Sequence, residues 1–315
     1  MEVLASIVVT TYNGEKYIIE QLQSIYKQTY SNMEVYILDD KSTDNTTNLV
    51  QSYIDKHNLG ERWHLIINTI NKGWRKNFID GMKLCNGDFI FPCDQDDIWN
   101  HDKISKMICI MNANNNINVL ASNIMEFFEN GKTRIRPLKE DGDVKKHAIV
   151  KNFFDNEYPG CSFCVRRSFF EKIEQFWWEK QPYDALLWRY AMFSDSLYTV
   201  SECLIEQRIH SDSTYRAESL RGKNIGSKIN EIKYMQIEVN NLVDFVFKHS
   251  YSKNKLDVLK QSNEWLRLRL DLYTKFNLVK ALVLIKYIDC YERKRKYFLD
   301  ILLASKILKM KEEKS

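Results

Sequence analysis

The first hundred residues alternate regularly between short apolar runs and segments with helical spacing. The runs are β-branched or aromatic, and their helical partners repeat apolar residues every three or four positions. The predicted strands are 4–10, 34–38, 63–67 and 89–91, and the predicted helices are 15–28, 44–54, 73–85 and 103–112. Short connections between such elements are typical of βαβ units. The chain is therefore predicted to be an α/β protein with a mostly parallel sheet.

The pattern changes in the second half of the chain. A strand or strand pair is predicted at 119–128, followed by a charged surface excursion at 131–146 and a tight turn with a short strand at 159–165. Two helices at 168–179 and 183–190 and a strand at 198–207 follow. Beyond residue 222 only helical periodicity remains. We therefore predict an α/β domain at 1–221 and an α-helical region at 222–315. The α/β domain is divided into a first half at 1–100 and a second half at 101–221.

Composition excludes several classes of protein. A net charge of +4 over 315 residues is too small to indicate nucleic-acid binding by itself. The seven cysteines include one CxxC pair, at Cys161 and Cys164, with no second pair to complete a zinc site, so reduced thiols are expected. The chain opens directly into a strand and has no long apolar run. We therefore expect no signal peptide, no membrane span and a cytoplasmic location.

Polar side chains gather where the predicted strands end. The ends present Thr11, Tyr12 and Asn13, then Asp39 and Asp40, then Asn71, and then Asp94. Ligands of open α/β sheets bind beyond the carboxyl ends of the strands, so these residues are candidates for ligand binding. Asp39 and Asp40 could also cap a helix or form a turn, although Asp44 already suits the cap position. No glycine-rich phosphate loop follows any strand.

Three carboxylates, Asp94, Asp96 and Asp97, crowd the end of the strand at 89–91. Like charges this close repel, and a divalent cation relieves the repulsion. Mg²⁺ or Mn²⁺ would take one or two carboxylates and bind phosphate oxygens at its other positions. A solvated acidic turn or a helix cap is the alternative. The absence of a phosphate loop favours the metal, because a bound nucleotide then needs another source of positive charge.

These motifs, taken in order, resemble the family 2 glycosyltransferases of bacteria, which are inverting enzymes with the GT-A fold. The resemblance covers about two thirds of the chain, and the subgroup it points to includes rhamnosyltransferase-like enzymes of cell-surface polysaccharides. It rests on IVVTTYNGEKYI, SIYKQTYSNMEVYILDDKSTDNT, NKGWRKNF, CNGDFIFPCDQDDIWNHDKI, PGCSFCVRR, YDALLW and RIHSDS. The chain departs from the family pattern at Thr10, Tyr183 and Gln207. The resemblance implies a Rossmann-like sheet with helices on both faces, in which 1–100 would be the nucleotide-sugar half and 101–221 the acceptor half.

The resemblance also implies roles for particular residues. Thr11, Tyr12 and Asp40 would contact the base and ribose of a nucleotide-sugar donor, with Asp39 beside them. Asp94 and Asp96 would form the DxD pair, Asp96 being the direct metal ligand. Asp184 would be the general base, for which helix capping is the alternative. Arg208 and His210 would lie near the diphosphate, with His210 as a further metal ligand.

The function implied is inverting transfer of a hexose or deoxyhexose from a nucleoside-diphosphate sugar. The acceptor would be a saccharide, or a lipid-linked saccharide, in bacterial surface polysaccharide synthesis. Two rivals stay open, a nucleotidyltransferase and a non-catalytic nucleotide-sugar binding module. A nucleotidyltransferase normally needs a glycine-rich or basic phosphate loop near the first strand. A non-catalytic binding module has no need of both Asp96 and Asp184, so their presence together argues against it.

The C-terminal segment at 282–310 carries apolar residues at mostly helical spacing around the basic cluster 293–296. An amphipathic helix packed on its neighbours, with a solvated basic face, is one interpretation. The other is a helix that lies on the inner face of the cell membrane and contacts anionic lipids.

Overall fold

A computed structural model describes residues 3–128, 130–135, 144–210 and 224–312, and side chains in the last helix as far as residue 306. The predicted boundary at 221/222 and the Ser211-Asp212 part of the RIHSDS motif lie outside these ranges. The chain divides into two compact units, one of residues 1–148 with 157–210, the other of 149–156 with 211–315.

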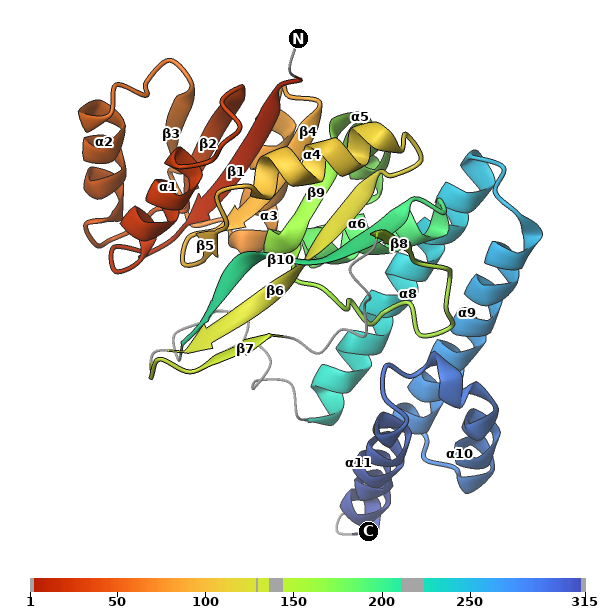
Figure 1. Ribbon diagram of the computed structural model, residues 1–315. Helices are drawn as coiled ribbons and strands as arrows, with labels where there is room; N and C mark the ends of the chain where they lie inside the picture. Colours follow the sequence, from red (N-terminus) through yellow and green to blue (C-terminus); the bar gives the residue numbers. More distant parts are fainter. Residues whose placement is uncertain (1–2, 129, 136–143, 211–223, 313–315) are drawn as a thin grey trace. The chain divides into compact units, whose positions relative to one another are not determined.

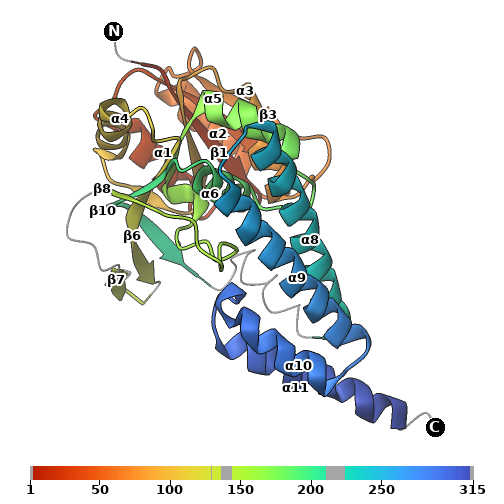
Figure 2. The same cartoon turned by 90° about the vertical axis from the view of Figure 1, so that its right-hand side faces the viewer.

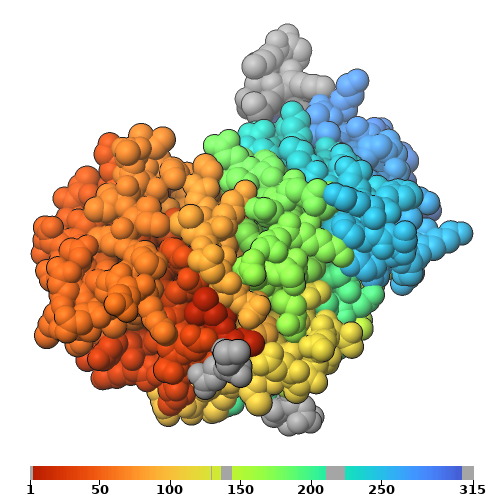
Figure 3. Space-filling view, turned by 90° about the horizontal axis from the view of Figure 1, so that it is seen from above, coloured from red at the N-terminus to blue at the C-terminus, as the bar shows by residue number. Residues whose placement is uncertain are grey.

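The first unit alternates strands and helices as the sequence predicts (Figure 1). Its first part contains β1 (Ala5–Thr11), α1 (Ile18–Tyr26), β2 (Met33–Asp39), α2 (Thr46–Lys56), β3 (Trp63–Ile67), α3 (Trp74–Leu84), β4 (Phe89–Asp94), β5 (Ile98–Trp99) and α4 (Lys103–Ala113). In the space-filling view these strand–helix pairs gather into one mass, red to orange (Figure 3).

The rest of the first unit is less regular. It contains β6 (Val119–Phe128), β7 (Thr133–Ile135), β8 (Val144–Lys146), the 3-10 turn η1 (Gly160–Ser162), β9 (Phe163–Arg166), α5 (Arg167–Ile173), η2 (Glu174–Phe176), α6 (Tyr183–Phe193) and β10 (Leu197–Ile209). The predicted helix at 168–179 is shorter than expected. It tightens into η2, and Trp177 is extended.

The strands form one sheet in the order β3-β2-β1-β4-β9-β6-β10-β5, with β7 beside β6 and β8 beside β10. The pairs among β3, β2, β1 and β4 are parallel, as predicted. The second half of the sheet is mixed, because β9 runs antiparallel to both β4 and β6. A short strand that follows a tight turn needs no crossover helix, so it can enter the sheet in this direction.

Helices cover both faces of the sheet. All seven residues of β1 are buried, and Ile7 and Val9 belong to the core formed with α1, α2 and α4. Val8 points to the other face, toward α3, as the two-residue repeat of a strand requires. A Cβ atom on Gly81 of α3 would lie 2.5 Å from Cγ1 of Val8 and 2.9 Å from Cδ1 of Leu38. Only a glycine therefore lets α3 approach the sheet this closely.

The second unit is helical in its described residues, apart from the segment 149–156. It contains α8 (Ile225–Lys248), α9 (Lys253–Thr274), α10 (Leu278–Leu284), η3 (Ile285–Cys290) and α11 (Arg295–Glu312). The long helices α8 and α9 run alongside each other in both views (Figures 1 and 2). Among the helices described here, none has the length and apolar character needed to cross a bilayer.

A buried ion pair ties α9 to α11. Arg269 and Asp300 are 2% and 3% exposed, and Nε of Arg269 lies 2.7 Å from Oδ2 of Asp300. The hydroxyl of Tyr273 donates to Oδ1 of Asp300 at 2.7 Å. The carboxylate thus has partners on both oxygens, which offsets the cost of burying its charge.

Candidate active site

The register of the sheet brings the predicted strand ends together. Thr11 of β1 lies opposite Asp39 of β2, and Thr10 lies opposite Asp94 of β4. Oγ1 of Thr11 donates to Oδ2 of Asp39 at 2.8 Å. Asp39 also accepts the N–H and the hydroxyl of Ser42 at 2.7 and 2.5 Å. Its carboxylate is fully buried, so it holds the turn that follows β2.

Asp40 ties the second strand end to the loop before α3. Its carboxylate accepts hydrogen bonds from Nδ2 of Asn68 at 3.0 Å and from the N–H groups of Lys72 and Gly73 at 2.8 Å each. Asn71, in the same loop, is exposed and accepts the N–H of Gly73 at 3.0 Å. Asp40 is 3% exposed and therefore shapes this edge of the sheet.

The turn after β1 is joined to two other turns. Gln95 accepts the N–H of Tyr12 at 2.9 Å and donates to the carbonyl oxygen of Tyr12 at 3.1 Å, which links this turn to the acidic one. Asn13 accepts the N–H of Thr43 through Oδ1 at 2.8 Å, which links it to the turn after β2. The side chain of Tyr12 is 46% exposed. Its ring is free to stack on a flat ligand such as a nucleobase.

Asp94 and Asp97 lie where a negative charge is costly. Burial, followed by the charge of Asp96, raises the pKa of Asp94 to about 7. Burial, followed by the charges of Asp96 and Asp94, raises the pKa of Asp97 well above its ordinary range. Oδ1 of Asp97 accepts the N–H of Arg208 at 3.1 Å, whereas Oδ2 is buried without a hydrogen-bond partner. A cation would stabilise both carboxylates in their charged form.

Asp96 has a different partner. Its Oδ2 lies 2.8 Å from Nε2 of His210, at the end of β10. The other ring nitrogen of His210 is buried without a partner, and the ring packs against Tyr17 at 5.1 Å between centroids. The structure therefore brings Asp96 and His210 together, two residues that are 114 positions apart in the chain.

Arg208, near the end of β10, holds the acidic turn. Its Nε donates to the carbonyl oxygen of Asp96 at 2.9 Å, and its guanidinium also bonds Glu20 of α1. The guanidinium carbon lies 4.6 Å from the ring centroid of Tyr17. Arg208 thus positions the backbone that carries the carboxylates.

The possible metal ligands in the described part of the chain include one group of three with ligand atoms within 4.8 Å of one another. It consists of Asp94, Asp97 and Cys161, rather than Asp94, Asp96 and His210. Two carboxylates are the ligands that Mg²⁺ and Mn²⁺ prefer, and the unpartnered oxygen of Asp97 is available to a cation. Burial raises the pKa of the Cys161 thiol, which is therefore protonated. The residues present fit a hard divalent cation through their carboxylates.

Asp184 lies near these carboxylates. The N-cap of α6 is Pro182, so Asp184 stands inside the first turn and does not occupy the predicted cap position. Every other residue of α6 is buried, whereas Asp184 is half-buried. Oδ1 of Asp184 accepts the N–H of Ala185 at 2.8 Å, and its charge contributes to the raised pKa of Asp94.

Three residues of this site are not among the candidates predicted from the sequence. Gln95 joins the first turn to the acidic turn, and Cys161 adjoins Asp94 and Asp97. Lys103 is fully buried, donates to the carbonyl oxygen of Cys161 at 2.6 Å and lies 3.9 Å from the ring centroid of Trp99. Burial lowers the pKa of Lys103 to about 8. The CxxC spacing marked Cys161, but no sequence pattern signalled Lys103.

We predict that Gly160→Ala destabilises the protein. A Cβ atom at this position would lie 2.3 Å from the hydroxyl oxygen of Tyr183, whose ring packs on Phe78 at 4.0 Å between centroids. The free energy of unfolding should fall by ~1–3 kcal/mol, a typical cost of overpacking. Urea denaturation measures it, and Gly60→Ala is the control, because no atom lies within 4 Å of that Cβ. Equal stability of the two variants would contradict the prediction.

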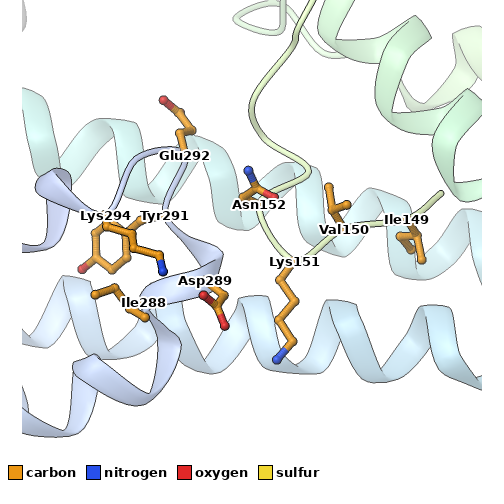
Figure 4. Close-up of a pocket in the computed structure, with 9 residues that line it drawn as sticks. All are labelled: Ile149, Val150, Lys151, Asn152, Ile288, Asp289, Tyr291, Glu292 and Lys294. Atoms are coloured by element: carbon orange, nitrogen blue, oxygen red, sulfur yellow. The ribbon is translucent and has the colours of Figure 1, made fainter. Parts of the chain in front are cut away.

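Two pockets in the described part of the chain lie away from these residues. A pocket of about 440 Å³ in the second unit is lined by residues 149–152 and by Ile288, Asp289, Tyr291, Glu292 and Lys294 (Figure 4). It carries charges of both signs, and none of the predicted site residues lines it. The polar side chains at the ends of β1, β2 and β4 are therefore identified as the candidate active site by their chemistry, and not by the shape of a cavity.

Solved structures place the fold. TarS of S. aureus, in complex with UDP-GlcNAc, aligns with a TM-score of 0.62 at 19% identity, over 90% of this chain and 79% of that chain. The mannosyltransferase PcManGT of Pyrobaculum calidifontis, in complex with GDP-Man and Mn2+, aligns with a TM-score of 0.50 at 14% identity, over 96% and 84%. The sheet and these likenesses define the GT-A fold.

The family follows from the sequence. Residues 6–174, more than half of the chain, match the model of glycosyl transferase family 2, and the chain belongs to this family. An uncharacterized glycosyltransferase of Haemophilus influenzae is 27% identical over 302 residues, 90% of this chain and 91% of that protein. The dTDP-rhamnosyl transferase RfbG of Shigella flexneri is 33% identical over 175 residues, which is 53% of this chain and 56% of RfbG. The predicted family, fold and rhamnosyltransferase-like resemblance are thereby confirmed.

Proposed function

We propose that this chain transfers a hexose or deoxyhexose from a nucleoside-diphosphate sugar, with inversion, to a saccharide or lipid-linked saccharide in bacterial surface polysaccharide synthesis. One observation carries the proposal: the half-buried carboxylate of Asp184, in the first turn of α6, lies close enough to Asp94 for its charge to raise the pKa of Asp94. A candidate base thus adjoins a candidate site for a metal-bound diphosphate. The names of RfbG and TarS, a dTDP-rhamnosyl transferase and a protein bound to UDP-GlcNAc, support this class of donor.

The donor would lie across the ends of β1, β2 and β4. The exposed ring of Tyr12 would stack on the base, and Thr11, Asp39 and Asp40 would shape the base and ribose site. Asn13 would hold the turns on either side, and the exposed Asn71 would contact the donor from the loop before α3. Hydrogen bonds within the protein already hold these side chains in place. Ordering them therefore costs less conformational entropy when the donor binds.

The diphosphate would lie at the acidic turn. Asp94 and Asp96 would hold Mg²⁺ or Mn²⁺, with His210 as a further ligand through its contact with Asp96. The cation, when bound, stabilises the charge that develops on the leaving diphosphate. Arg208 keeps the turn in place, because its Nε donates to the carbonyl oxygen of Asp96 and its backbone N–H donates to Oδ1 of Asp97. It would lie beside the diphosphate.

Asp184 would act as the general base. An acceptor hydroxyl attacks the anomeric carbon from the face opposite the diphosphate and must lose its proton as the new bond forms. The carboxylate of Asp184 takes that proton, while the bond to the diphosphate breaks and the electron pair leaves with it. A single displacement of this kind inverts the anomeric centre and needs no covalent intermediate with the enzyme.

The test offers the protein a panel of dTDP-, UDP- and GDP-linked sugars, with Mn²⁺ and an extracted lipid-linked acceptor. The release of free nucleoside diphosphate is measured for each donor. We expect release from one donor of the panel, with dTDP-rhamnose the first to be tried. Binding with no release would favour a nucleotide-sugar binding module. Exchange of labelled pyrophosphate in place of release would favour a nucleotidyltransferase.

A further inference from the structure

The exposed apolar side chains of the protein are concentrated near its C-terminus. Of the 18 large apolar residues exposed in the described part of the chain, seven fall between residues 278 and 302. They are Leu278, Val279, Leu282, Ile285, Phe298, Leu299 and Leu302, each more than half exposed. Such a concentration of exposed apolar side chains is unusual, and it is typical of a surface that binds another protein, a membrane or a ligand.

These side chains occupy one face of each helix. Successive residues of a helix are turned by about 100°, so Leu278, Leu282 and Ile285 lie in one stripe along α10 and the start of η3. The opposite side of α10 is buried through Ala281 and Leu284. On α11, Phe298, Leu299 and Leu302 share a face, and the opposite face is buried through residues 297, 300 and 304.

The buried faces are already occupied by neighbours. The hydroxyl of Tyr297 donates to the carbonyl oxygen of Ala281 at 2.9 Å, which joins α11 to α10. Asp300 is paired with Arg269 of α9. Figures 1 and 2 show α10 and α11 side by side. The apolar faces of both helices thus point away from these contacts within the second unit.

Basic side chains lie among the exposed apolar ones. Lys286 follows Ile285 directly at the start of η3. By the same 100° rule, Arg295 and Lys306 fall between Phe298 and Leu299 on α11. All three are exposed. Residues 275–306 contain eight Lys and Arg against three Asp and Glu, and one of these three, Asp300, is buried in its ion pair. The exposed faces are therefore both apolar and positively charged.

We propose that the exposed faces of α10, η3 and α11 dock on an anionic lipid surface. Apolar side chains enter the boundary between headgroups and acyl chains, while Lys286, Arg295 and Lys306 contact the lipid phosphates. Charge complementarity selects this occupant, because a second copy of the same faces would bring like charges together. The inference is independent of the chemistry at the strand ends.

The experiment is co-sedimentation of the full-length protein with vesicles at low and high salt. Vesicles rich in phosphatidylglycerol are compared with vesicles of phosphatidylcholine alone. The double variant Leu282→Gln with Phe298→Gln removes apolar contact, and Lys286→Gln with Arg295→Gln removes charge. Phe247→Gln is the matched control, because Phe247 of α8 is 66% exposed and Phe298 is 63% exposed.

We expect the wild type and Phe247→Gln to sediment with the anionic vesicles at low salt and to be released at high salt, since screening weakens the attraction. The apolar double variant should bind at least about tenfold more weakly, and the charge variant should lose its preference for anionic lipid. The proposal is overturned if the wild type ignores anionic vesicles or if the apolar variant binds them equally well. Concentration-dependent dimerisation lost in the apolar variant, with no vesicle binding, would assign the faces to a second copy instead. Release of nucleoside diphosphate with a water-soluble acceptor tests the proposed function separately.

Discussion

Asp184→Asn is expected to bind the donor normally and to turn over at least ~100-fold more slowly, the usual size of a general-base contribution. Asn keeps the oxygen that accepts the N–H of Ala185 and loses only the ability to take a proton. The cap of α6 is Pro182, so the substitution leaves the start of the helix unchanged. Donor affinity by calorimetry and turnover by release of nucleoside diphosphate measure the two effects.

The control for this variant is its thermal unfolding, which should match that of the wild type. A turnover near that of the wild type would assign Asp184 a structural role at the start of α6. Loss of donor binding together with turnover would place Asp184 in the donor site instead of beside the acceptor.

Asp96→Ala is expected to lose the metal-dependent part of donor binding. The affinity for the donor in Mn²⁺ should fall by at least about 100-fold, because even the loss of a partner behind a metal ligand costs 10–100-fold. In the absence of metal the affinities of variant and wild type should be equal. Calorimetric titration of the donor, with Mn²⁺ and with a chelator, measures both.

Two further variants decide which carboxylates hold the metal. Asp88→Ala is the control, since Asp88 is exposed just before the start of β4, the strand that ends at Asp94. Asp97→Asn keeps the oxygen that accepts the N–H of Arg208 but removes charge from the group formed by Asp94, Asp97 and Cys161. If Asp97→Asn abolishes metal dependence and Asp96→Ala retains it, the metal site is the buried group and Asp96 serves only to hold His210.

The sequence by itself determined the parallel half of the fold. Apolar β-branched runs such as β1 are buried on both faces in the structure, and β3 has the predicted bounds. The motifs also placed Asp39, Asp94 and Thr11 at the ends of strands, because the carboxyl ends of parallel strands meet at one edge of the sheet. Local propensity and periodicity are sufficient for such statements, since they depend on residues near one another in the chain.

Tertiary structure alone decided how the side chains of the site are paired. His210 meets Asp96 only because β10 returns beside β5 and brings together residues 114 positions apart. The antiparallel entry of β9 places Cys161 against Asp94 and Asp97, and the burial of Lys103 beneath them left no periodic signal. The exposure of Leu282 and Phe298 likewise depended on which faces of α10 and α11 their neighbours cover. Periodicity shows that a helix has an apolar face, but only the packing of the chain decides whether that face is buried.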